Sequence, residues 1–102
     1  MHLTFSPSRR DMPLTLHRAG DVLTINGEAF DFAFIPEGGT LPKAAASSEW
    51  FASDITRIDG ALHLTLVLPH GARAPQSTLF PEPIILTANG PVSLPAFEET
   101  EL

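Results

Sequence analysis

The sequence predicts an all-β protein, built from antiparallel hairpins and a meander that form a small two-sheet sandwich or an open barrel of about seven or eight strands. Three Asn-Gly or Asp-Gly pairs, each between two strand-like stretches, carry this prediction, because such pairs adopt the positive φ angles of tight hairpin turns. They are Asn26-Gly27, Asp59-Gly60 and Asn89-Gly90. Apolar and polar residues also alternate beside the first two pairs, which is typical of sheets buried on one face. Sequence spacing alone does not separate a sandwich from a barrel.

The length of 102 residues and the apolar content of 43% are those of one globular domain with a packed core. We expect a single antiparallel β domain over residues 1–95. The remaining residues, 96–102, include three glutamates and no basic residue, and we expect a disordered, solvated acidic tail there.

The first organised region, residues 13–34, is predicted to be a three-stranded meander. A two-residue turn at Asn26-Gly27 pairs Leu23 with Phe30, and the preceding turn is expected to pair Arg18 with Asp21. Both turns sort the same apolar residues onto one face: Leu14, Leu16, Leu23, Ile25, Phe30 and Phe32. Residues 36–48 then contain prolines and glycines that interrupt strands, so we expect a connection with at most one short helical turn at 42–46.

The second hairpin turns at Asp59-Gly60, which pairs Arg57 with Leu62 and Phe51 with Leu68. Its apolar face collects Phe51, Ile55, Leu62, Leu64, Leu66 and Leu68. Arg57 falls on this apolar side near the turn, and we expect its guanidinium to extend to the rim of the sheet.

The third hairpin is expected to pair residues 84–88 with 92–95 around Asn89-Gly90, at a sheet edge, because prolines there cannot donate ladder hydrogen bonds. The irregular connection before it, residues 69–83, is unusually long for a compact domain and is the first place to look for a binding surface. Residues 2–6 would add an eighth strand at a sheet edge.

Charge and composition exclude several classes of partner. Twelve acidic and six basic residues give a net charge of -6, which disfavours nucleic acid and membrane surfaces as partners. Cysteine is absent, so disulfides and thiolate metal sites are excluded. No signal-peptide or membrane-spanning stretch is present, and we expect a cytoplasmic protein without a cofactor.

The best candidate for acid-base chemistry is Asp54 with His63, diagonal neighbours on the polar face of the second hairpin at about 7–8 Å. A solvated sheet face is the commoner explanation of such a pair, since catalysis also needs a pocket and a third group. Ser53 is expected on the opposite face, so a serine nucleophile beside His63 is not supported. The four histidines have no metal-binding spacing, and we expect no enzyme activity, catalytic residue or metal site.

Four residues are candidates for an interface. His70, Arg73 and Phe80 lie in the long connection, and Trp50 stands next to a strand start. A tryptophan in this position can stack on a sugar, anchor a protein partner, or pack between sheets, which is its commoner role.

The strings at 23–27, 57–60 and 62–66, followed by Leu68-Pro69-His70-Gly71, resemble those of short uncharacterised proteins from bacterial prophage regions near tail genes. This resemblance implies a phage-related structural or assembly role, and a virion-associated location, without catalytic residues. The leading hypothesis is therefore a non-enzymatic interaction module that binds a protein partner or self-associates. A small-ligand or carbohydrate-binding β module is the alternative, and an enzyme using Asp54 and His63 is the third.

Overall fold

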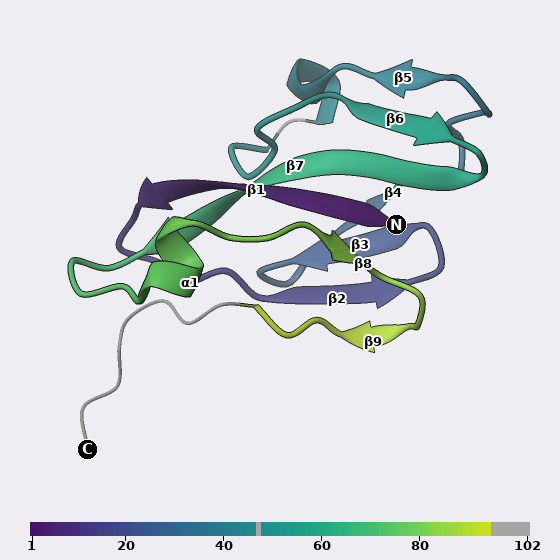
Figure 1. The fold of residues 1–102 in the computed structure, drawn as a ribbon. Coiled ribbons are helices and arrows are strands. Elements are labelled where there is room, and N and C mark those ends of the chain that lie inside the picture. The colour runs from purple at the N-terminus through teal and green to yellow at the C-terminus, as the bar shows by residue number, and fades with distance from the viewer. Residues whose placement is uncertain (47, 95–102) are drawn as a thin grey trace.

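The fold consists of two facing β-sheets that do not close into a barrel, as the sequence predicts (Figure 1). A computed structural model describes residues 1–46 and 48–94, so the tail expected at 96–102 lies outside the described residues. Within those residues, no helix has the length and apolar character needed to cross a membrane.

The first sheet has five strands. In spatial order they are β5 (Thr40–Leu41), β6 (Ile55–Ile58), β7 (Ala61–His70), β1 (His2–Arg9) and β8 (Ile84–Ile85). β1 runs parallel to β7 over its whole length and lies inside the sheet, whereas an edge position was expected. A parallel pair needs a long crossover, and the strands β2 to β6 between β1 and β7 provide it. No turn sequence predicts a parallel pairing of this kind.

The second sheet contains the predicted meander. Its order is β4 (Glu28–Asp31), β3 (Val22–Ile25), β2 (Leu16–Ala19) and β9 (Gly90–Pro91). The predicted pairing of Leu23 with Phe30 is confirmed. Arg18, however, faces Leu23 and not Asp21, because Gly20 and Asp21 themselves form the turn, with Gly20 at φ 61°. A shift of two residues keeps every side chain on its predicted face. Five of the six predicted face residues are buried: Leu14, Leu16, Leu23, Ile25 and Phe32.

The second hairpin pairs Arg57 with Leu62 as predicted, but Phe51 bridges Leu66 and not Leu68. The chain before β6 therefore contains two more residues than its partner strand, and it bulges between Phe51 and Ile55. The shift is again even, so Phe51 stays in the core, where it is 5% exposed.

The predicted third hairpin is wrong, because its two halves belong to different sheets. β8 pairs with β1, and β9 pairs with β2. The Asn89 side chain accepts a hydrogen bond from the Gly20 backbone N–H at 2.8 Å, so it joins the chain to the β2–β3 turn. The segment between β8 and β9 thus crosses from one sheet to the other.

The core lies between the sheets, around side chains of both that are almost fully buried, among them Leu3, Leu23, Ile25, Ile55 and Leu66. The predicted helical turn is confirmed as the 3-10 turn η1 (Lys43–Ala46). A second single turn, α1 (Gln76–Leu79), lies in the long connection and was not expected.

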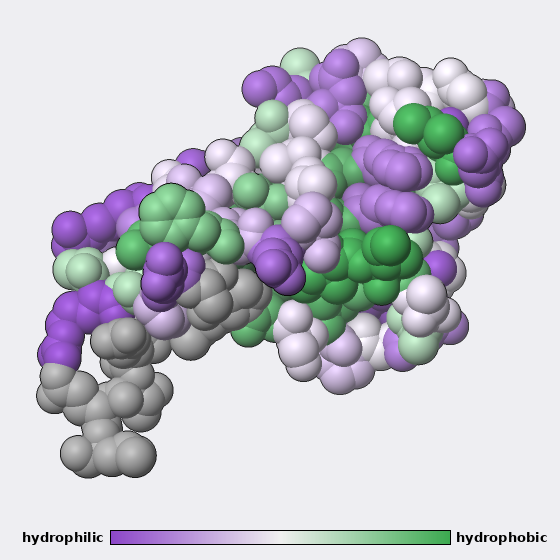
Figure 2. Space-filling view, viewed as in Figure 1, coloured by the Kyte–Doolittle hydropathy of each residue, from purple (hydrophilic) through white to green (hydrophobic). Residues whose placement is uncertain are grey.

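Several large apolar side chains remain exposed, and Figure 2 shows hydrophobic surface among hydrophilic side chains on the side where α1 and β8 lie. In the described residues these are Met12, Phe34, Ile58, Leu79, Phe80 and Ile85.

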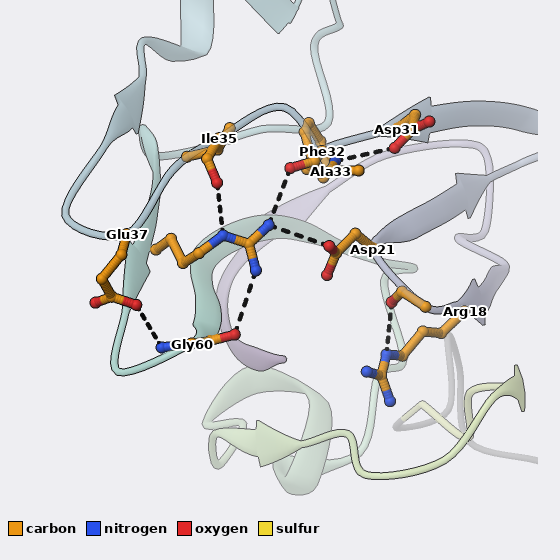
Figure 3. A network of polar contacts seen from close by, with 10 residues as sticks. Arg18, Asp21, Asp31, Phe32, Ala33, Ile35, Glu37 and Gly60 are labelled. Carbon is orange, nitrogen blue, oxygen red and sulfur yellow. Dashed lines mark hydrogen bonds and ion pairs between the residues drawn. The ribbon is translucent and has the colours of Figure 1, made fainter.

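The expectation that Arg57 extends to the rim is wrong. Its side chain is only 13% exposed, and its guanidinium donates to the Asp21 carboxylate at 3.1 Å. It also donates to the backbone carbonyl oxygens of Ile35 at 2.6 Å, Phe32 at 3.2 Å and Gly60 at 3.2 Å. Figure 3 shows these acceptors converging on one guanidinium. A buried arginine is tolerated here because four acceptors from the hairpin turn, the loop after β4 and the β2–β3 turn surround it.

Candidate functional site

A row of outward-facing residues crosses all five strands of the first sheet. Each residue lies directly opposite the next in register, and the row consists of Thr40, Thr56, His63, His2 and Ile85. We call it the cross-strand row. Two histidines, His63 and His2, occupy the middle of this row. They are far apart in the sequence, and the parallel pairing of β1 with β7 places them side by side.

The rings of His2 and His63 stack, with centroids 4.2 Å apart and an angle of 16° between their planes. Both residues are half-buried. Loss of hydration, together with the nearby positive charges of His63 and the amino terminus, lowers the pKa of the His2 imidazole below its usual value of 6.5. His2 is therefore mostly neutral at neutral pH.

A small hollow of about 160 Å³ lies beside the stacked rings. It is lined by His2, Thr4, Ser53, His63, Leu64 and Thr65. Thr4 and Thr65, the next outward-facing pair in register, share a hydrogen bond between their hydroxyl groups. The hollow thus combines two imidazoles with neutral hydroxyl groups.

Ser53 lies on the same side as His63, contrary to the sequence-based expectation, because the bulge before β6 turns this residue to the outer face. Its hydroxyl donates to the Asp54 carbonyl oxygen at 2.8 Å and accepts the Thr65 N–H at 2.8 Å. The hydroxyl proton is directed to a backbone carbonyl and not to an imidazole. A serine nucleophile activated by His63 is not formed in this arrangement.

The hypothesised pair of Asp54 and His63 is not brought together. Asp54 is exposed, and its carboxylate accepts the Lys43 backbone N–H at 3.0 Å at the start of η1. Among the described residues lining the hollow beside His63, Asp54 is absent. His63 instead contacts His2, a partner that the sequence did not suggest because the parallel pairing was not foreseen.

The four predicted interface residues are placed differently. Trp50 is half-buried against the core, and its carbonyl oxygen accepts the Val67 N–H at 2.8 Å. His70 ends β7 with Nδ1 3.0 Å from the Gly71 carbonyl oxygen, while Arg73 is exposed beyond it. Phe80, directly after α1, is 72% exposed. Exposure thus favours Phe80 over Trp50 as a contact residue.

Two further exposed apolar residues were missed. Leu79 is 40% exposed and Ile85 is 61% exposed. One signal could have found Ile85: in a strand with one buried face, two adjacent isoleucines cannot both be buried.

A larger apolar hollow of about 390 Å³ opens between β2, β7 and the chain around β9. It is lined by Pro13, Leu14, Thr15, Leu16, Leu68, Pro69, Pro91, Val92 and Leu94. Its volume is within the usual range for small-molecule sites, and the described residues that line it include neither Trp50 nor a charged side chain. In the part of the chain that the structure describes, no group of three or more His, Asp or Glu residues is placed to hold a metal ion.

Fold and surface together define a small two-sheet β protein with an exposed apolar segment and a paired-histidine face. No protein family, curated protein or solved structure that was compared with the chain matches it.

Proposed function

We propose that this protein is a non-enzymatic interaction module that self-associates or binds a protein partner through residues 76–86. The observation that carries the proposal is the exposure of three large apolar side chains within this short segment. Phe80 is 72% exposed, Ile85 61% and Leu79 40%. Apolar side chains gathered on a surface mark interaction sites, and aromatic residues are favoured as anchors.

The position of the segment supports this proposal. β8 is the edge strand of the first sheet and has only two residues in the ladder, so its outer side faces no other described strand. Edge strands add strands from partners by backbone hydrogen bonds, while neighbouring side chains give specificity.

The resemblance of several strings to prophage tail-region proteins gives the proposal a biological setting. In that setting the protein is a structural or assembly accessory of a phage particle, and its partner is another particle protein or a second copy.

The test compares Phe80→Ser with the matched control Phe34→Ser, since Phe34 is 67% exposed in the loop after β4, outside the proposed surface. Sedimentation and light scattering over a range of concentrations measure self-association, and affinity capture from the native host measures partner binding. We expect F80S to weaken the association and F34S to leave it unchanged. A strict monomer that captures no partner, or equal behaviour of the two variants, contradicts the proposal.

The 390 Å³ hollow favours a second candidate function, binding of a small apolar molecule. Its apolar lining suits an aliphatic ligand better than a carbohydrate, which needs polar groups and a stacking aromatic ring. Aliphatic probes should shift the methyl NMR signals of Leu16 and Leu68, and Leu94→Arg should abolish the shifts. Shifts confined to other residues would rule this candidate out.

A further inference from the structure

The stacked histidines have ring nitrogens without a hydrogen-bond partner among residues 1–46 and 48–94. Imidazole nitrogens are strong donors and acceptors, and neighbouring groups usually engage at least one of them. The two rings lie on adjacent strands in direct register, so the backbone holds them side by side. The next outward-facing pair, Thr4 and Thr65, differs, because its two hydroxyl groups are hydrogen-bonded to each other.

We infer that His2 and His63 together bind a divalent transition-metal ion, Cu²⁺ in preference to Ni²⁺ or Zn²⁺, with water completing its coordination. Imidazole suits all three ions, and the general order of complex stability places Cu²⁺ first. The backbone holds the two imidazoles side by side, with centroids 4.2 Å apart, so an ion bound to one ring has a second ligand close by, and this raises the affinity far above that of one histidine.

The site allows the movement that binding requires. Stacked rings must turn about their Cβ–Cγ bonds before nitrogens of both converge on one ion. Both residues are half-buried on the outer face, and the 160 Å³ hollow beside them provides space. On either side in the cross-strand row stand Thr56 and Ile85, which are uncharged and do not compete for the ion.

The described groups around the pair offer little competition for the ion. One alternative ligand, the amino group of the preceding residue Met1, donates to the Leu86 carbonyl oxygen at 3.1 Å. Among the described residues lining the hollow there is no carboxylate, so the pair of imidazoles is its metal-binding element.

The test is a Cu²⁺ titration of the full chain by calorimetry at neutral pH, with electron paramagnetic resonance to count the coordinated nitrogens. The variants are His2→Thr and His63→Thr, because threonine suits strands and a threonine pair already occupies the next outward-facing position in register. His17→Thr is the matched control, a single exposed histidine on β2 of the other sheet. Circular dichroism and thermal unfolding check that each variant folds.

We expect one Cu²⁺ per chain with two imidazole nitrogens, an affinity at least about tenfold lower in H2T and in H63T, and no change in H17T. Zn²⁺ should bind more weakly than Cu²⁺ at the same pair. Wild-type affinity in H63T would overturn the inference, because His2 and the amino terminus would then hold the ion. Equal losses in H17T and H63T would also overturn it, because the ion would then bind surface histidines without preference.

Discussion

Replacing Arg57 by methionine should destabilise the fold more than any other exchange of an arginine, because Arg57 joins both sheets from a nearly buried position. Methionine keeps much of the side-chain length and removes the charge and all donors. Three backbone carbonyls and the Asp21 carboxylate then lose a partner.

The magnitude follows from the burial of the two charged groups. Hydrogen bonds to charged groups contribute about 1.5–3 kcal/mol each when measured alone, and breaking a buried ion pair costs about 3–5 kcal/mol. Asp21 is 38% exposed, so water replaces part of what it loses. We therefore expect R57M to lower the free energy of unfolding by about 3 kcal/mol, a large share of the roughly 5–15 kcal/mol typical of a domain.

Urea unfolding followed by Trp50 fluorescence and by circular dichroism measures this loss. Asp21→Asn should cost about 1 kcal/mol, because the three carbonyl acceptors of Arg57 remain. The control is Arg18→Met, whose bonds to the Gly20, Leu86 and Ala88 carbonyls are 3.0, 3.4 and 3.4 Å long and mostly exposed. A loss below about 1 kcal/mol in R57M, or a loss equal to that of R18M, would refute the assignment of Arg57 as the connection between the sheets.

Three further predictions concern the turns, the core and the histidine pair. Gly60→Ala should cost about 1 kcal/mol in urea unfolding, because Gly60 has φ 79° while its added Cβ meets no atom within 4 Å, so backbone strain alone acts. Leu66→Ala, at a residue with 0% exposure, should cost about 3 kcal/mol, and a loss near that of a surface exchange would contradict the assigned core. In metal-free buffer, the free energy of unfolding should fall as the pH decreases below about 6.5, because the unfolded chain protonates His2 more readily than the folded chain. His2→Thr should flatten that part of the pH profile, and an unchanged profile would contradict the lowered pKa.

The local parts of this fold could be predicted from the sequence because turn residues and alternation act over short distances. The pairings of Leu23 with Phe30 and of Arg57 with Leu62 are confirmed. Where a turn shifted by two residues, as between Arg18 and Leu23, the faces remained right because side chains alternate with period two.

The non-local parts could not be predicted, since no short sequence signal encodes them. The parallel partner of β1 follows five intervening strands in the chain, β2 to β6, and the Asn89-Gly90 pair resembles a hairpin turn although the flanking strands join different sheets. The candidate site depends on the first of these pairings. His2 and His63 could not be recognised as neighbours until the position of β1 was known, and the bulge that turned Ser53 outward was equally invisible.

The parallel pairing of β1 with β7 has a consequence for the order of folding. The two hairpins can form early from neighbouring residues, whereas β1 meets its partner across 61 positions of chain. Contacts of such long sequence separation are made slowly, because the entropy of closing the loop is lost before they form. Seating β1 between β7 and β8 is therefore expected to be the slow step, and weakening its contacts should retard refolding more than it accelerates unfolding.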